Sequence, residues 1–175
     1  MGSLTFVSIV VMGVQGIGKS TIGSLLASEL GVPFIDGDRL HPARNIKIMA
    51  SGKPLNDSDR APWLSIVGET LAGHQASGGA VIACSALRRA YRDFLRASAP
   101  DAYFVEPFGP VALVSQRIAK RDHEYMPHAL LQSQYGTLEP LQSDEKGLRT
   151  SVVLTPDAIV EQVISSYRAQ MEQPA

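Results

Sequence analysis

The feature that most constrains this chain is a run of eight residues near its start. Gly13-Val14-Gln15-Gly16-Ile17-Gly18-Lys19-Ser20 fits the pattern G-x-x-x-x-G-K-[ST]. An apolar stretch, Phe6 to Met12, precedes it, and an apolar stripe at helical spacing follows it, formed by Ile22, Leu25, Leu26 and Leu30. Glycines suit such a run because a chain that wraps an anion with its amides uses backbone angles that side chains resist. The run therefore predicts a phosphate-binding loop between a strand and a helix.

Each part of this loop has an expected role in nucleotide binding. Its main-chain amides would hold the phosphates, and the helix that begins here adds the positive end of its dipole. The Lys19 ammonium is expected to reach the β- and γ-phosphates, and the Ser20 hydroxyl to ligate Mg²⁺. The side chains of Gln15 and Ile17 should matter little, since backbone amides do the binding. The predicted nucleotide-binding residues of the loop are Gly13, Val14, Gln15, Gly16, Ile17, Gly18, Lys19, Ser20 and Thr21.

Apolar runs of strand length alternate with segments of helical period along the chain. This alternation predicts an α/β domain of three layers, a parallel sheet with helices on both faces. Five strands are expected, at Phe6 to Met12, Val32 to Ile35, Ala80 to Cys84, Tyr103 to Val105 and Ser151 to Leu154. Further helices are expected at Pro62 to Leu71, Arg88 to Leu95, Pro110 to Arg121 and along the stripe from Ile159 to Tyr167. We expect one domain over residues 1–175, with a small mobile lid at about 122–146, where periodicity is weak.

The overall charge limits the expected partners. With 16 basic and 17 acidic side chains, the chain has no broad cationic face for nucleic acid or anionic lipid. No apolar stretch approaches the ~20 residues that span a bilayer, and no Lys or Arg precedes Lys19 to form the basic start of a signal peptide. The single cysteine, Cys84, suits a small buried side chain in a reducing compartment. We therefore expect a cytoplasmic protein that binds neither nucleic acid nor membrane.

A phosphate loop alone is compatible with GTPases, motors, transporter ATPases and small-molecule kinases. The GTPase pattern N-K-x-D is absent, because Asn56-Asp57-Ser58-Asp59 has its outer residues but no lysine. The transporter pattern L-S-G-G-Q is absent as well. A chain of 175 residues leaves little room for anything but a small kinase.

A second candidate site follows the second expected strand. Asp36-Gly37-Asp38 lies at a strand's carboxyl end, where ligands of open α/β sheets bind. If the extended backbone continues through Gly37, its period of two places both carboxylates on one face, ~7 Å apart. One carboxylate could then serve a metal through water while the other faces an acceptor hydroxyl. The alternative is an ordinary Asp-Gly-Asp turn, which the neighbouring phosphate loop disfavours.

Cationic and polar side chains gather after the second and third strands. They are His41, Arg44, Arg60, Ser85 and Arg88. Arginines beside paired aspartates fit a substrate that carries a negative charge and several hydroxyls. Solvated surface positions for individual arginines, and a packing role for His41, stay open as alternatives.

Two further arginines lie near the end of the helix expected at Pro110 to Arg121. Arg117 and Arg121 are four residues apart, so on one helix they share a face and repel each other. An anion beside them would relieve that repulsion. The alternative is a solvated basic helix end that also includes Lys120.

Several short motifs recur together in one known family. Beside the phosphate loop these are Asp36-Gly37-Asp38, Leu40-His41-Pro42, Pro54-Leu55-Asn56-Asp57, Asp59-Arg60, Pro62-Trp63-Leu64, Cys84-Ser85-Ala86-Leu87, Tyr91-Arg92 and Thr137-Leu138-Glu139-Pro140. With these motifs the chain resembles the bacterial gluconokinases, P-loop kinases related to the shikimate kinases, over about Val11 to Glu145. The segment His123-Glu124-Tyr125 departs from the Gly-His-Phe of many members, so no role is carried onto it.

The resemblance implies a three-layer P-loop kinase fold, a homodimer, and transfer of the ATP γ-phosphate to the 6-hydroxyl of D-gluconate. It implies that Asp36 joins Ser20 around Mg²⁺ and that Asp38 orients or deprotonates the acceptor hydroxyl. Arg117 would lie near the adenine, and Arg121 would neutralise the transferring phosphoryl group beside Lys19. His41, Arg44, Arg60, Ser85 and Arg88 remain the expected substrate contacts.

Two other functions stay open. A kinase for another small hydroxylated acid, such as shikimate, is disfavoured by the block Asp36-Gly37-Asp38 with His41-Pro42. A nucleotide-binding regulator without turnover is disfavoured because Lys19, Ser20, Asp36 and Asp38 are all present.

Overall fold

The computed structural model describes residues 6–121 and 128–171 and contains the predicted five-stranded parallel sheet. The strands are β1 (Val7–Val11), β2 (Phe34–Asp36), β3 (Gly79–Ala83), β4 (Tyr103–Phe108) and β5 (Gly147–Ser151). Their order across the sheet is β2-β3-β1-β4-β5, and every neighbouring pair is parallel. The predicted fold class is confirmed.

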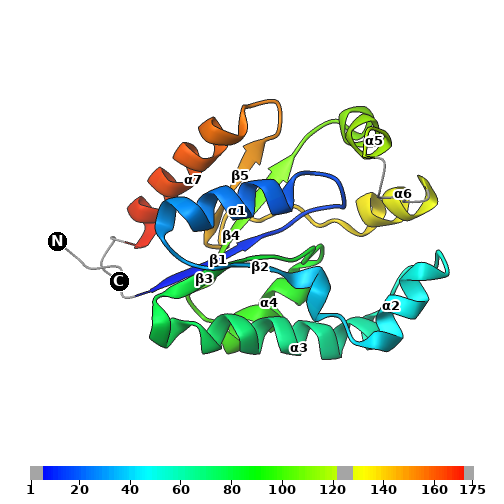
Figure 1. The fold of residues 1–175 in the computed structure, drawn as a ribbon, viewed down its shortest axis with the longest axis horizontal. Helices are drawn as coiled ribbons and strands as arrows, with labels where there is room; N and C mark the ends of the chain where they lie inside the picture. The colour runs from blue at the N-terminus through cyan, green and yellow to red at the C-terminus, as the bar shows by residue number, and fades with distance from the viewer. Residues whose placement is uncertain (1–5, 122–127, 172–175) are drawn as a thin grey trace.

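Helices cover both faces of the sheet (Figure 1). On one face lie α1 (Lys19–Leu30) and α7 (Pro156–Met171), and on the other α3 (Asp57–Gly73) and α4 (Arg89–Ser98). Alternate residues of β1 supply the two cores: Val10 packs with α3 and α4, whereas Ile9 and Val11 pack with α1 and α7. The sequence of a central strand is therefore a nearly continuous apolar run, as in β1, VSIVV.

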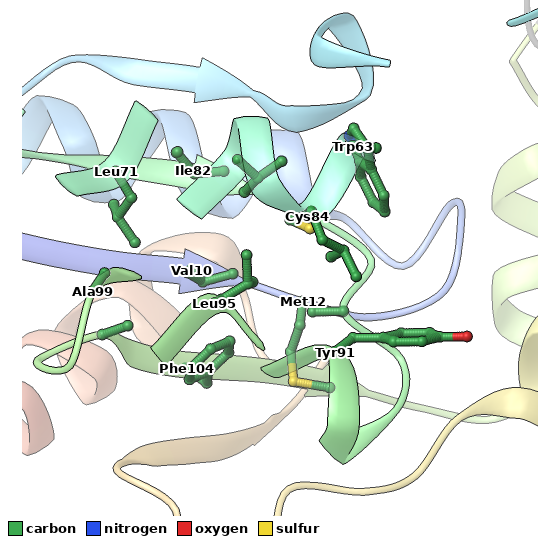
Figure 2. Close-up of a cluster of buried hydrophobic side chains, with 14 residues drawn as sticks. Val10, Met12, Trp63, Leu71, Ile82, Cys84, Tyr91, Leu95, Ala99 and Phe104 are labelled. Atoms are coloured by element: carbon green, nitrogen blue, oxygen red, sulfur yellow. The ribbon is translucent and has the colours of Figure 1, made fainter. Parts of the chain in front are cut away.

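The core between the sheet and α3 and α4 reaches the edge of the sheet that concerns function. Figure 2 shows Trp63 and Tyr91 at the same end of this cluster, with the Tyr91 hydroxyl pointing out of it. Cys84 belongs to the same cluster and is fully buried, as expected. Burial, then the nearby charge of Asp38, raises the pKa of its thiol to about 12, so Cys84 is an inert core residue.

Two helices have no counterpart in the sequence prediction, and a third begins earlier than expected. α2 (Ala43–Ala50) and α6 (His128–Thr137) lie at the same end of the molecule in Figure 1. α3 begins ahead of Pro62 because Asn56 and Asp59 form a capping box: Asp59 N donates to Asn56 Oδ1 (2.8 Å), and Asn56 N to Asp59 Oδ2 (3.1 Å). The remaining elements are α5 (Val111–Ala119) and the 3₁₀ helices η1 (Gly37–Leu40) and η2 (Gln75–Ser77).

The prediction of the last strand was wrong. Ser151 to Leu154 was expected to be extended, but β5 ends at Ser151 and the apolar residues after it form a turn. Within the described part of the chain, β5, of sequence GLRTS, is an edge strand that pairs only with β4, and its Arg149 donates to Glu106 on β4 (3.0 Å). An edge strand with polar partners lacks the apolar run that marks the central strands.

The predicted lid, 122–146, is described only in part. Residues 122–127, including His123-Glu124-Tyr125, lie outside the described residues. Beyond α6 the chain returns to the body, where the fully buried Glu145 carboxylate accepts from Arg92 Nε (2.8 Å) and Nη2 (2.9 Å). This ion pair fixes the last part of the segment to α4, and the lid stays a prediction for the residues before it.

Within residues 6–121 and 128–171, no helix is long and apolar enough to cross a membrane.

Candidate functional site

The loop between β1 and α1 has the backbone that its sequence predicts. Gly13, Gly16 and Gly18 take φ values of 128°, 79° and 111°. A Cβ on Gly16 would also overlap the Ile118 side chain, so glycine is required there by both angle and space. The first amides of α1 have no partner within the helix and point along its axis at the loop. The loop is therefore shaped to receive an anion.

Hydrogen bonds from and to side chains help to hold the loop in place. Lys19 Nζ donates to the carbonyl oxygens of Gly13 (3.0 Å) and Val14 (2.9 Å), which keeps its charge over the loop. Gln15 N donates to Gln134 Oε1 of α6 (2.7 Å). The sequence prediction assigned no role to Gln134.

A hollow of about 210 Å³ lies on one side of the loop. It is lined by Gly16, Ile17, Gly18, Thr21, Ile22, Arg117, Arg121, Val152, Leu154, Pro156 and Ile159. The expectation that Arg117 and Arg121 share a helix face was wrong, because α5 ends at Ala119 and Arg121 follows it. The hollow nevertheless brings both arginines together beside the loop, and Arg117 Nη2 is fixed by the carbonyl oxygen of Val152 (3.0 Å).

A second cavity, of about 330 Å³, adjoins the loop on the side of β2 and β3. Of the predicted residues, it brings together Gln15, Lys19, Asp38, His41, Arg60 and Ser85. Its other walls are Met49, Lys53, Pro54, Leu55, Trp63, Leu130, Ser133, Gln134 and Thr137. We call this space the acceptor cavity. Lys19 belongs to both the phosphate loop and this cavity, so the two sites are continuous.

The paired aspartates do not have the predicted extended geometry. β2 ends at Asp36, Gly37 begins η1, and Asp36 Oδ1 caps that turn by accepting from Asp38 N (3.0 Å). The turn fits closely because a Cβ on Gly37 would overlap the carbonyl oxygen of Ala83. Trp63 Nε1 donates to the carbonyl oxygen of Gly37 (2.8 Å). The result places Asp38, and not Asp36, in the lining of the acceptor cavity.

His41 is held as a neutral ring at the cavity wall. It stacks on Trp63 with ring centroids 4.0 Å apart, and its Nδ1 lies 3.2 Å from Asn45 Nδ2. Because an amide nitrogen can only donate, Nδ1 accepts and the ring proton resides on Nε2. Burial, then the charge of Arg60, lowers the pKa of His41 to about 4. His41 can therefore donate one hydrogen bond at neutral pH without carrying charge.

The three arginines predicted to contact substrate separate in the structure. Arg60 lines the acceptor cavity, whereas Arg44 and Arg88 are not among its lining residues. Arg44 lies 3.6 Å from Asp59 with a side chain that is 82% exposed, and Arg88 lies 3.6 Å from Asp57. This lining does not support the prediction that Arg44 and Arg88 contact substrate. Lys53 was missed, since an isolated lysine in a polar loop carries no distinguishing signal.

The predicted metal ligands fit magnesium in their chemistry. Ser20 is exposed at the start of α1, and the Asp36 carboxylate is 34% exposed at the end of β2. Among the described residues, no group of three or more His, Cys, Asp or Glu side chains could hold a metal alone. Mg²⁺ is commonly bound by one or two protein oxygens, with phosphates and water completing its shell.

The known proteins that this chain resembles are small-molecule kinases. The family profile "Shikimate kinase" matches residues 15–146. The gluconokinase of Gluconobacter oxydans is 41% identical over 163 residues, 93% of this chain and 92% of that protein. The thermoresistant gluconokinase of Escherichia coli is 39% identical over 158 residues, 90% of this chain and 89% of that protein.

Solved structures give the same relationship. A gluconokinase from Sinorhizobium meliloti superposes with a TM-score of 0.86 at 42% identity, covering 94% of this chain and 93% of that one. A shikimate kinase from Aquifex aeolicus has a TM-score of 0.66 at 18% identity, covering 95% and 99%. The second similarity bears on the fold alone.

Proposed function

The chain, with its shikimate kinase domain, belongs to the gluconokinase family, and we propose that it transfers the γ-phosphate of ATP to the 6-hydroxyl of D-gluconate, giving 6-phospho-D-gluconate. The observation that carries this proposal is the continuity of the two sites through Lys19. A kinase needs a phosphate cradle that opens directly into a space for the acceptor, and the acceptor cavity meets that need.

The chain's own groups supply positioning and charge for an in-line transfer. Asp38 lines the acceptor cavity with Lys19, where its carboxylate would orient the attacking hydroxyl or take its proton. Lys19, and Arg121 from beside the loop, would neutralise charge on the transferring phosphoryl group. Arg117 would contact the adenine end of the nucleotide.

The acceptor cavity suits an open-chain sugar acid. Arg60 and Lys53 supply positive charge for a carboxylate, while Ser85 and the neutral His41 supply hydrogen bonds for hydroxyls. Arg60 is the better ligand for the carboxylate, because its planar fork matches two carboxylate oxygens. The stacked His41 and Trp63 rings give this wall a fixed shape.

Magnesium, the homodimer and a cytoplasmic location complete the proposal. Ser20 and Asp36 would hold Mg²⁺, which when bound neutralises the charge of the ATP phosphates. The homodimer follows from the family resemblance, and the location from the expected reducing environment of Cys84.

The test is ADP release measured with gluconate, shikimate, other sugar acids and nucleoside monophosphates as acceptors. We expect ADP release that depends on gluconate, with 6-phosphogluconate formed in equal amount. Lys19→Ala, purified in the same way, controls for contaminating kinases. ADP release only with another acceptor would make that compound, and not gluconate, the substrate. Release with none of them would favour a regulator that binds nucleotide without turnover.

A further inference from the structure

Arg60 needs a partner that fixes its direction. It lies in the first turns of α3 and has a long side chain, which in isolation samples many rotamers. A guanidinium that recognises a carboxylate with both nitrogens must hold one plane. The contact that supplies this plane comes from another helix.

Tyr91 of α4 is that partner. Arg60 Nη1 donates to the Tyr91 hydroxyl (3.3 Å), and the Arg60 guanidinium carbon lies 5.4 Å from the Tyr91 ring centroid. The same hydroxyl donates its own proton to Asp57 Oδ1 through a short hydrogen bond. Its donor is thus directed at Asp57, and a lone pair of its oxygen is left for Arg60.

The surroundings fix Tyr91 more firmly than they fix Arg60. The Tyr91 residue is only 7% exposed, and it packs in the core cluster on α3 and α4. Figure 2 shows the ring rooted in that cluster with the hydroxyl pointing out of it. Burial, then the hydrogen bond to Asp57, raises the pKa of Tyr91, so the hydroxyl keeps its proton for Asp57.

Arg88 lies on the same ring. Its guanidinium carbon lies 5.9 Å from the Tyr91 centroid, and its Nη1 lies 3.6 Å from Asp57 Oδ2. Tyr91 and Asp57 thus stand between two arginines, of which only Arg60 lines the acceptor cavity. Arg88, which follows β3, therefore contacts Tyr91 and Asp57 and does not line the cavity.

We propose that Tyr91 is a positioning residue, whose hydroxyl holds the Arg60 guanidinium in the plane that receives the substrate carboxylate. The inference rests on the proposed function, because it assigns the partner of a group in that site. It also adds a specificity determinant that lies outside the cavity lining.

Tyr91→Phe tests the proposal, since it keeps the ring in the core and removes only the hydroxyl. Loss of a hydrogen bond to a charged group predicts a KM for gluconate about fivefold to tenfold higher, with kcat within about twofold and KM for ATP unchanged. Tyr103→Phe is the matched control: it removes a hydroxyl that donates to Ser166 (2.7 Å), in the core on the opposite face of the sheet. We expect Tyr103→Phe to leave both KM values unchanged.

The variant Arg60→Ala separates positioning from direct contact. If Tyr91 acts through Arg60, adding Tyr91→Phe to Arg60→Ala changes KM for gluconate by less than about twofold. An unchanged KM in Tyr91→Phe alone, or a full effect in the Arg60→Ala background, would overturn the inference. Wild-type turnover of gluconate in the same assay tests the proposed function separately, so the two failures are distinguishable.

Discussion

The phosphate loop and the acceptor cavity share Lys19 but are built differently. The loop is one continuous stretch, residues 13–21, whose main-chain amides and glycine angles create the site. The acceptor cavity collects side chains from η1, α2, α3, α6 and the loops after α2 and β3. Its shape depends on contacts that hold the lining in place, such as the hydrogen bond from the lining residue Trp63 to Gly37 and the ion pair of Arg92 with Glu145. The loop is thus a local structure, whereas the cavity is a product of packing.

This difference predicts how each region responds to mutation. The loop should depend on its glycines, on Lys19 and on the Ser20 hydroxyl. The cavity should depend on residues that never touch substrate, because they fix those that do. The following experiments are ordered from the largest expected effect to the smallest.

Lys19→Ala should reduce turnover by at least about a thousandfold, because it removes the loop's charge toward the β- and γ-phosphates. The thermal unfolding midpoint should change little, since Lys19 packs in none of the core clusters. ADP release and a thermal melt measure the two effects. Retained turnover would show that Lys19 has no part in the mechanism. It would also remove the residue that joins the phosphate loop to the acceptor cavity in the proposed reaction.

Asp38→Asn should reduce kcat by about a hundredfold or more, because the amide keeps the shape but cannot accept a proton. KM for ATP should stay near the wild-type value, since Asp38 belongs to the cavity wall. Asp101→Asn is the control, as Asp101 pairs only loosely with Lys146 (3.8 Å). A near-normal rate in Asp38→Asn would assign the acceptor hydroxyl to another group.

Glu145→Gln tests the support behind the cavity. It leaves Arg92 buried without its carboxylate partner and should lower the free energy of unfolding by about 3 kcal/mol, measured by denaturant titration. Exposed Glu69→Gln should lower it by less than about 0.5 kcal/mol. Equal stability of the two variants would show that the Arg92 contact is not what anchors the chain after α6.

The same carboxylate predicts part of the acid response. Burial alone would raise the pKa of Glu145, but hydrogen bonds led by that from Arg92 hold it at about 2. Its stabilising contribution is therefore complete above its ordinary pKa of 4.5 and lost as the pH falls toward 2. The free energy of unfolding, measured across that range, should decrease less steeply with falling pH for Glu145→Gln than for wild type. An equal slope would contradict this assignment.

His41 predicts a pH effect in a higher window. Because its folded pKa of about 4 lies below the ordinary 6.5, the unfolded chain takes up a proton first as the pH falls. Stability should therefore decrease between pH 6.5 and pH 4, and His41→Gln should remove that part of the slope in denaturant titrations. Parallel curves for the two proteins would mean that the pKa of His41 is the same in the folded and the unfolded chain, and would contradict this assignment.

Arg44→Ala should have the smallest effect. Its exposed side chain is only loosely paired with Asp59, so KM for gluconate should change by less than about twofold. Arg60→Ala, of the same chemistry but in the cavity wall, should raise that KM by more than tenfold. Similar KM values for the two variants would mean that a position in the cavity wall does not determine which arginine binds gluconate.

The central strands and the edge strand β2 were predictable from the sequence, but the edge strand β5 was not. β1 reads as an apolar run because two cores flank it, whereas β5 is polar and was placed too late in the chain. α3 was predicted too short because its apolar pattern begins after its capping box at Asn56 and Asp59. α2 and α6 have short or irregular apolar patterns, which do not mark them as helices in the sequence.

For the candidate site, the sequence alone determined the phosphate loop, because glycine angles and a helix start are local properties. It also placed Asp38, His41, Arg60 and Ser85 near the carboxyl edge of the sheet, since the topology of parallel strands brings those loops together. Only the tertiary structure decided which arginine enters the cavity and that Asp36 turns back to cap η1. Both depend on the direction of a side chain. That direction is set by contacts with residues that are distant in sequence, as Tyr91 is from Arg60.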